Sequence, residues 1–78
     1  MGLAEVIDRE LALLRDEFRE VVVMVDVEGR SYLEVAEELA VPTGTVRSRL
    51  YRGRRLLQAA LIARAEDAGL VPAGEVEG

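Results

Sequence analysis

The segment VPTGTVRSRLYRGRRLL, residues 41–57, decides the fold of this chain. Pro42 disfavours helix in the residue before it, so any preceding helix must end directly upstream. After the proline, Thr43 or Gly44 can cap a new helix, because both residue types are favoured at helix N-caps. Few helix-breaking residues follow, which predicts one long helix over about residues 44–65.

A helical wheel of this predicted helix separates two faces. The apolar face consists of Val46, Leu50, Gly53, Leu57, Ala60 and Leu61. The opposite face consists of Arg47, Ser48, Tyr51, Arg52 and Arg55, with Arg49 and Arg54 on its two borders. The helix is therefore expected to bury an apolar stripe and to present an arginine-rich stripe to solvent.

Charge is distributed unevenly along the chain, although its 78 residues carry a formal net charge of −5. Residues 41–65 contain six arginines and no acidic residue, whereas residues 1–40 contain eleven acidic residues and four arginines. A basic face on an acidic body is typical of a domain that binds nucleic acid. Arginine-rich helix faces are often only solvated surface, but such faces usually carry acidic partners at i+3 or i+4, and this one has none.

Three shorter helices are expected upstream. Apolar residues recur at helical spacing over about residues 3–14 and 16–27. Ser31 and Glu34 form the capping-box pattern, which starts a helix over about residues 31–40. The β-branched run VVVMV favours a strand locally, but a lone strand would have no partner in this chain.

The predicted fold is therefore an all-α domain of four helices, in which the last two form a C-terminal helix-turn-helix. We expect the domain to cover residues 1–68. Residues 69–78 combine helix-breaking glycine and proline with acidic residues, and they are expected to form a flexible acidic tail.

Several function classes are disfavoured by composition. The chain has no cysteine, histidine or lysine, so an enzyme, a metal site or a bound cofactor is not expected. No apolar run approaches the roughly 20 residues that a membrane span needs, and the N-terminus lacks the pattern of a signal peptide. The absence of cysteine also fits a cytoplasmic protein.

Two linked motifs occur at a fixed spacing: residues 41–57 follow P-x-G-T-V-x-S-R-L and then R-x-R, and EGRSYLEVAEEL, residues 28–39, follows E-G-x-S-Y-x-E-I-A. Together they resemble a known family, region 4 of bacterial extracytoplasmic-function (ECF) sigma factors. The resemblance covers residues 14–57 and implies the winged-helix-like class of sigma region 4. It also implies binding to the minus-35 promoter element in transcription initiation, contact with the β-flap of RNA polymerase core, and masking by an anti-sigma factor.

The resemblance also implies roles for individual residues. Base-reading positions are matched by Arg47, Ser48, Tyr51 and Arg52. Positions near the DNA backbone are matched by Ser31, Tyr32, Thr43, Gly44 and Thr45. The N-termini of helices suit phosphate because their first N–H groups are free. The other arginines of the long helix, Arg49, Arg54 and Arg55, are expected to reach phosphates as well.

The chain departs from the family pattern at three points. Arg15 replaces a proline after Leu14, so the first two helices are expected either to merge or to meet at a different angle. Ala40 replaces a glycine in the turn, and alanine fits a left-handed backbone less well. The family's promoter-melting region is absent from these 78 residues, so the chain is expected to be an excised domain or a stand-alone relative.

Two other functions stay open at this point. The output domain of a LuxR-type regulator has a similar four-helix body, although it lacks the G-T-V-x-S-R-L and R-x-R pattern. A module that holds polymerase or an anti-sigma factor without reading DNA is the second alternative. Val23, Met24 and Val27 could serve such an interface, although packing against the first helix explains them better.

Overall fold

The predicted order of helices is present in the computed structural model of the chain, which describes residues 2–69. The elements are α1 (Leu3–Leu13), α2 (Asp16–Val22), the π-helix η1 (Val23–Val27), α3 (Tyr32–Leu39) and α4 (Thr43–Asp67). No strand occurs among the described residues, so the all-α prediction is confirmed. The tail expected over residues 69–78 lies, apart from Gly69, outside the described part of the chain.

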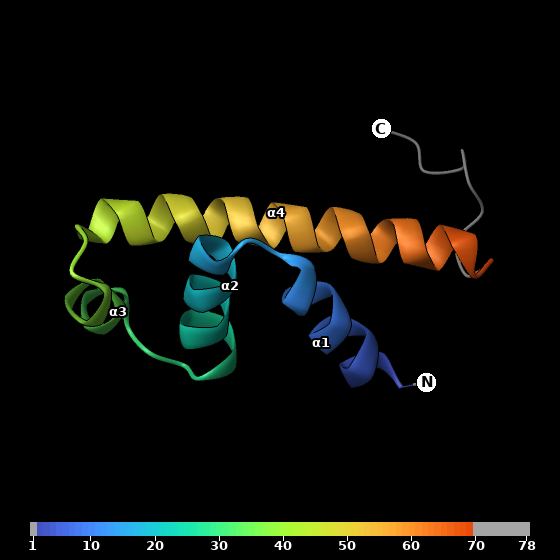
Figure 1. Ribbon diagram of the computed structural model, residues 1–78, viewed down its shortest axis with the longest axis horizontal. Helices are drawn as coiled ribbons and strands as arrows, with labels where there is room; N and C mark the ends of the chain where they lie inside the picture. The colour runs from blue at the N-terminus through green and yellow to red at the C-terminus, as the bar shows by residue number, and fades with distance from the viewer. Residues whose placement is uncertain (1, 70–78) are drawn as a thin grey trace.

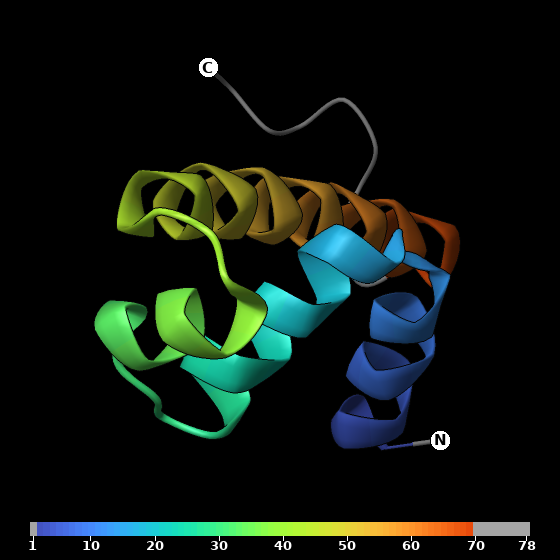
Figure 2. The same ribbon diagram turned by 60° about the vertical axis from the view of Figure 1, so that its left-hand side comes forward.

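The long helix α4 organises the molecule. The helices α3, α2 and α1 follow one another along it, with α3 beneath its N-terminal end and α1 beneath its C-terminal half (Figure 1). A second view shows the same arrangement, with all three helices on one side of α4 (Figure 2). The opposite side of α4 is therefore left uncovered by the other helices.

A small apolar core joins these helices. Its buried members are Leu11, Val21, Val22, Val35, Ala36, Val46 and Leu50. On α4 the predicted apolar face is buried only in its N-terminal half, because Val46 is 0 % and Leu50 2 % exposed. Farther along the same face, Leu57 and Leu61 are only partly buried.

Gly53 marks a close approach of two helices in this core. A Cβ atom built at Gly53 would lie 2.8 Å from Val22 Cγ2 and 3.3 Å from the backbone oxygen of Phe18. A side chain at this position would therefore push α4 away from α2. The glycine allows the two helices to pack at short range, at the cost of lower helix propensity.

The ends of α3 follow the sequence-based expectation. The Ser31 hydroxyl accepts a hydrogen bond from the Glu34 N–H at 3.1 Å, and the Glu34 carboxylate accepts one from the Ser31 N–H at 2.9 Å. Ala40 ends the helix with φ 58°, which is the left-handed backbone conformation that favours glycine. The Val41 N–H then donates to the Ala36 carbonyl at 3.0 Å, which closes the turn.

The predicted cap of α4 is wrong. Pro42, with φ −64° and ψ 152°, stands at the N-cap, and Thr43 and Gly44 are already helical. The extended conformation of the proline lets its carbonyl accept the N–H groups of Thr45 at 3.0 Å and Val46 at 3.3 Å. No side chain caps the helix, which runs to Asp67 rather than residue 65.

The first two helices do not merge. The backbone is extended at Leu14 and Arg15, with ψ 153° and ψ 149°. Arg19 donates from Nη1 to the carbonyl oxygens of Leu14 at 3.2 Å and Ala12 at 3.4 Å. A guanidinium therefore satisfies carbonyls left free at the C-terminal end of α1, which allows a break without proline.

The second predicted helix, residues 16–27, is continuous but changes type at Val23. Val23 and Met24 of the π-helical part are partly buried against the core, whereas Val27 is 66 % exposed. Only Val27 therefore remains as a candidate for a protein contact among the three apolar residues singled out in the sequence. None of the described helices combines the length and apolar character needed to cross a membrane.

Candidate nucleic-acid interface

The first turns of α4 present the side chains that the sequence singles out as base-reading. These are Arg47, Ser48, Tyr51 and Arg52, and all four are exposed. They lie opposite the buried stripe of the same helix, because Val46, Leu50 and Gly53 hold the other side against α2 and α3. An α-helix with its side chains is roughly 10–12 Å wide, which matches the major groove of DNA.

Ion pairing divides the six arginines of α4 into two groups. Arg54 donates to Asp26 of η1 through Nε at 2.9 Å and Nη2 at 2.5 Å. Arg64 donates to Glu10 of α1 through Nε at 2.6 Å. The four others have no carboxylate partner within residues 2–69, and they are Arg47, Arg49, Arg52 and Arg55.

The Asp26 carboxylate limits the ability of Arg54 to bind a phosphate. Its hydrogen bonds raise the pKa of the Arg54 guanidinium above the ordinary value, although partial burial opposes that shift. A phosphate would have to displace Asp26 or share the guanidinium with it. Arg55 contacts an aromatic ring and not a carboxylate, since its guanidinium lies 5.7 Å from the centre of the Tyr51 ring. Arg54 is therefore a weaker candidate for a phosphate contact than Arg55.

Arg47 is held by an aromatic ring instead of an acid. Its guanidinium carbon lies 5.3 Å from the centre of the Tyr32 ring, across the turn between α3 and α4. A ring face attracts a cation without neutralising it. Tyr32, expected near the DNA backbone, is therefore brought into contact with an expected base-reading residue.

Two helix N-termini contribute the remaining predicted backbone positions. At the start of α4, the N–H groups of Thr45 and Val46 donate to the Pro42 carbonyl, and no side chain caps the helix ahead of Thr43 and Gly44. At the start of α3, the capping box already occupies the N–H groups of Ser31 and Glu34. The N-terminus of α4 is accordingly the more open of the two for a phosphate.

The remaining polar positions of the helix-turn-helix lie nearby. The Ser48 hydroxyl donates to the Thr45 carbonyl at 3.2 Å, which turns the hydroxyl back toward its own helix. Arg49, on the border of the arginine-rich face, is partly buried. The structure thus places the predicted residues at the start of α3 and on the N-terminal half of α4.

Asp26 is the functional neighbour that sequence reasoning missed. It is 28 positions from Arg54, and only the packing of η1 beside α4 brings the two together. One signal was available, because Asp26 is an isolated acid within a β-branched run of the second helix. An acid in such a run is a candidate partner for an arginine on a neighbouring helix.

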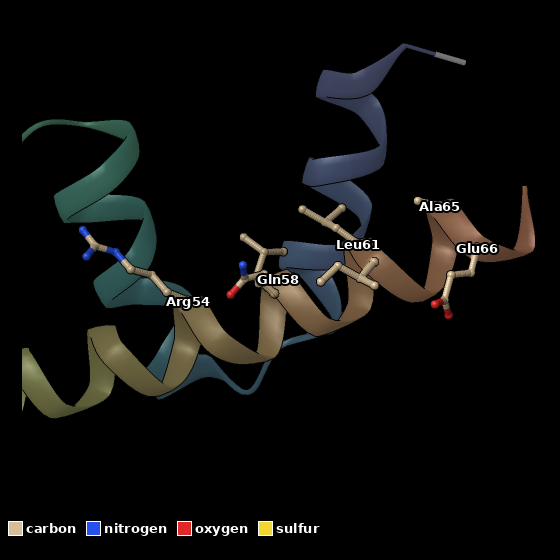
Figure 3. Close-up of a pocket in the computed structure, with 7 residues that line it drawn as sticks. Arg54, Gln58, Leu61, Ala65 and Glu66 are labelled. Atoms are coloured by element: carbon tan, nitrogen blue, oxygen red, sulfur yellow. The ribbon is translucent and has the colours of Figure 1, made fainter. Parts of the chain in front are cut away.

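The C-terminal half of α4 has a different surface. An open hollow of about 610 Å³ is lined by Arg54, Leu57, Gln58, Leu61, Ile62, Ala65 and Glu66. Figure 3 shows the hollow along α4, with Arg54 at the end nearest the helix formed by α2 and η1, and Ala65 and Glu66 at the other end, past α1. Ile62 is 47 % exposed, so apolar surface is left open to solvent here. Such a hollow suits an apolar protein segment better than DNA.

Comparison with known proteins points to one family. The family model described as "Sigma-70, region 4" matches residues 4–57. A SigE ECF RNA polymerase sigma factor of Mycolicibacterium smegmatis is 53% identical over 45 residues, 58% of this chain and 18% of that protein. The SigW factor of Bacillus subtilis is 36% identical over 58 residues, 74% of this chain and 31% of that protein. The ECF sigma-E factor of Escherichia coli K12 is 33% identical over 55 residues, 70% of this chain and 29% of that protein.

The chain therefore spans less than a third of the length of these three relatives. The region matched by the family model includes α2, α3 and the N-terminal half of α4, which carry the arginine-rich face and the turn that precedes it.

Proposed function

Because the chain belongs to the sigma-70 region 4 family, we propose that it binds the minus-35 promoter element and supports transcription initiation as region 4 of an ECF sigma factor. The observation that carries this proposal is the uncovered arginine-rich face of α4. Four of its arginines have no carboxylate partner within the described part of the chain. Solvated arginines on a helix that fits the major groove supply both base contacts and phosphate contacts.

In this proposal the first turns of α4 enter the major groove. Arg47 and Arg52 pair with guanine edges, because a guanidinium can donate two parallel hydrogen bonds to one guanine. Ser48 and Tyr51 make the remaining base contacts. The backbone is contacted by Ser31, Tyr32, Thr43, Gly44, Thr45, Arg49, Arg54 and Arg55, with Arg54 the weakest of the arginines because Asp26 already holds it.

Residues 1–68 are proposed to act as the folded unit, and binding by this unit alone is expected to be weak. Acidic residues outnumber arginines in the chain, whose 78 residues carry a formal net charge of −5, and this excess repels DNA beyond the basic face. The match covers less than a third of each of these relatives, and a second promoter contact elsewhere in such a protein would add affinity.

Selection of bound duplexes from a randomised library tests the proposal. The chain is expected to enrich one motif, and each mismatch in that motif should cost about 1–3 kcal/mol of binding free energy. Arg52→Ala should weaken the enrichment. Arg9→Ala removes the same charge from an exposed position of α1 and serves as the matched control. Enrichment of no sequence at low salt would contradict base reading.

A second function is favoured by the apolar hollow on the C-terminal half of α4. We propose that the hollow, with neighbouring surface of α1 and α2, binds the β-flap of RNA polymerase, and that an anti-sigma factor competes for it. Leu57, Leu61 and Ile62 supply apolar surface, and the rim carries polar groups. In these two proposals the N-terminal half of α4 binds DNA and the C-terminal half binds the β-flap.

Pull-down with a β-flap fragment tests this second proposal. Leu61→Glu places a charge in the hollow and should abolish capture of the fragment, because an unpaired carboxylate cannot be buried there. Ala63→Glu adds the same charge at an exposed position outside the hollow and should leave capture unchanged. If both variants bind the fragment as well as the original chain, the flap does not occupy this hollow.

A further inference from the structure

Tyr32 and Arg47 form a contact that joins the two helices of the helix-turn-helix. Tyr32 is the first residue of α3, is partly buried and packs against the core. The Arg47 guanidinium carbon lies 5.3 Å from the centre of its ring. That distance is within the roughly 6 Å at which a guanidinium is attracted by an aromatic face.

The ring is the main restraint on the Arg47 guanidinium within residues 2–69. No hydrogen bond or ion pair to another described residue fixes this side chain. An arginine side chain loses about 2 kcal/mol of rotamer entropy when it is fixed, so an unrestrained Arg47 would have to lose that freedom on binding. A partly buried ring anchored in the core reduces the loss in advance.

The two ways of holding an arginine in this molecule have different consequences. Asp26 holds Arg54 through two hydrogen bonds, which occupy its Nε and one N–H of Nη2 and set a carboxylate charge against the guanidinium. Tyr32 holds Arg47 through the face of its ring, which leaves the N–H donors of the guanidinium free. Of the two restraints, only the ring leaves all five N–H donors and the full positive charge of the guanidinium to a ligand.

From this contact we infer that Tyr32 is a positioning residue for Arg47 and sets the base preference of the domain at the base pair that Arg47 reads. The inference rests on the proposed function, since it needs Arg47 to contact a base. It assigns the role to the aromatic ring of Tyr32. A backbone-binding position would use the hydroxyl instead, as the donor to a phosphate oxygen.

Substitutions at Tyr32 separate the ring from the hydroxyl. Tyr32→Phe removes the hydroxyl and keeps the ring, and Tyr32→Leu removes both. Because a hydroxyl contact to the backbone carries no base preference, Tyr32→Phe should change affinity for all duplexes by one factor and keep their ranking. Tyr32→Leu should lose about two- to fivefold discrimination at one base pair. That base pair should be the one relaxed by Arg47→Ala, and Tyr32→Leu should add nothing to Arg47→Ala at this position.

The base-preference profile of every variant is measured with the same randomised duplex library at one salt concentration. The temperature is kept below the melting temperature of each protein variant. Tyr32→Met replaces Tyr32→Leu if the latter does not fold, because it keeps an apolar side chain of adaptable shape without a ring. Loss in Tyr32→Phe equal to that in Tyr32→Leu would assign the role to the hydroxyl and overturn the inference. A uniform loss of affinity in Tyr32→Leu, with unchanged preference, would overturn it as well.

The same experiment distinguishes failure of the inference from failure of the proposed function. If the original chain shows no base preference, the proposed function fails. If the original chain has a preference that Arg47→Ala relaxes and Tyr32→Leu does not, the proposed function stands and only the role of Tyr32 is wrong.

Discussion

The two halves of α4 differ in how their arginines are neutralised. In the N-terminal half, Arg47, Arg52 and Arg55 project from the uncovered side and have no carboxylate partner within the described residues. In the C-terminal half, Arg64 pairs with Glu10 of α1. Arg54, at the boundary, points toward η1 and pairs with Asp26. The same residue type therefore offers charge to a ligand in one half and joins helices in the other.

This difference arises from the neighbouring helices and not from α4 itself. The segment from residue 41 to residue 65 contains no acidic residue, so every carboxylate that pairs with it comes from another element. α1 and η1 each provide one, and they pack on the side of α4 that also carries the core. Arginines on the opposite side have no carboxylate partner within the described residues, as the proposed contact with DNA requires.

The largest expected effect concerns the packing of the two halves. Leu50 is 2 % exposed, and Leu50→Ala should destabilise the domain by about 2–5 kcal/mol, because it leaves a cavity in the core. Leu61 is only partly buried, so Leu61→Ala should cost about 1 kcal/mol. Urea unfolding followed by circular dichroism compares the two variants. Equal losses would show that the two halves are packed alike.

The next effect concerns the close approach at Gly53. Gly53→Ala should destabilise the domain by about 1 kcal/mol, because overpacking against the buried Val22 exceeds the gain in helix propensity. Gly44→Ala is the matched control, since no atom lies within 4 Å of its added Cβ. It should stabilise the domain by about 0.5–1 kcal/mol.

Thermal unfolding of both glycine variants gives the comparison. Stabilisation by Gly53→Ala as large as that by Gly44→Ala would mean that α2 can move away from α4 without cost.

The smallest effect separates Arg54 from Arg55, which the sequence alone predicts to behave alike. Arg55→Ala should flatten the slope of log affinity against log salt by about one unit, because one phosphate contact is lost. Arg54→Ala should leave the slope nearly unchanged and cost up to about 1 kcal/mol of stability, because its ion pair is half exposed. Titrations of one duplex at several salt concentrations measure both slopes. A flatter slope for Arg54→Ala alone would reverse the assignment.

Local features of the fold could be predicted from the sequence. The Ser31–Glu34 capping box and the apolar periodicity around Val46 and Leu50 involve residues within a few positions of one another. The family motifs likewise lie within short segments, so a linear pattern is enough to identify them. The fold and the family were therefore accessible, and the family match covers residues 4–57.

Features that depend on helix packing could not be predicted. The Arg54–Asp26 and Arg64–Glu10 pairs join residues 28 and 54 positions apart, and helical periodicity carries no information about such distances. No sequence pattern places Tyr32 beside Arg47, because the angle between α3 and α4 decides whether they meet. The cap of α4 was missed because Pro42 itself adopts the N-cap conformation.

The central claim is that the N-terminal half of α4 reads bases in its first turns and contacts only the backbone one turn later. The base-preference profiles of Arg47→Ala and Arg55→Ala, measured at one salt concentration, test it most directly. Arg47→Ala should cost about 1–3 kcal/mol on the preferred duplex and relax one base pair, whereas Arg55→Ala should weaken all duplexes by the same factor. If both variants lose affinity for preferred and scrambled duplexes equally, α4 does not read bases through Arg47.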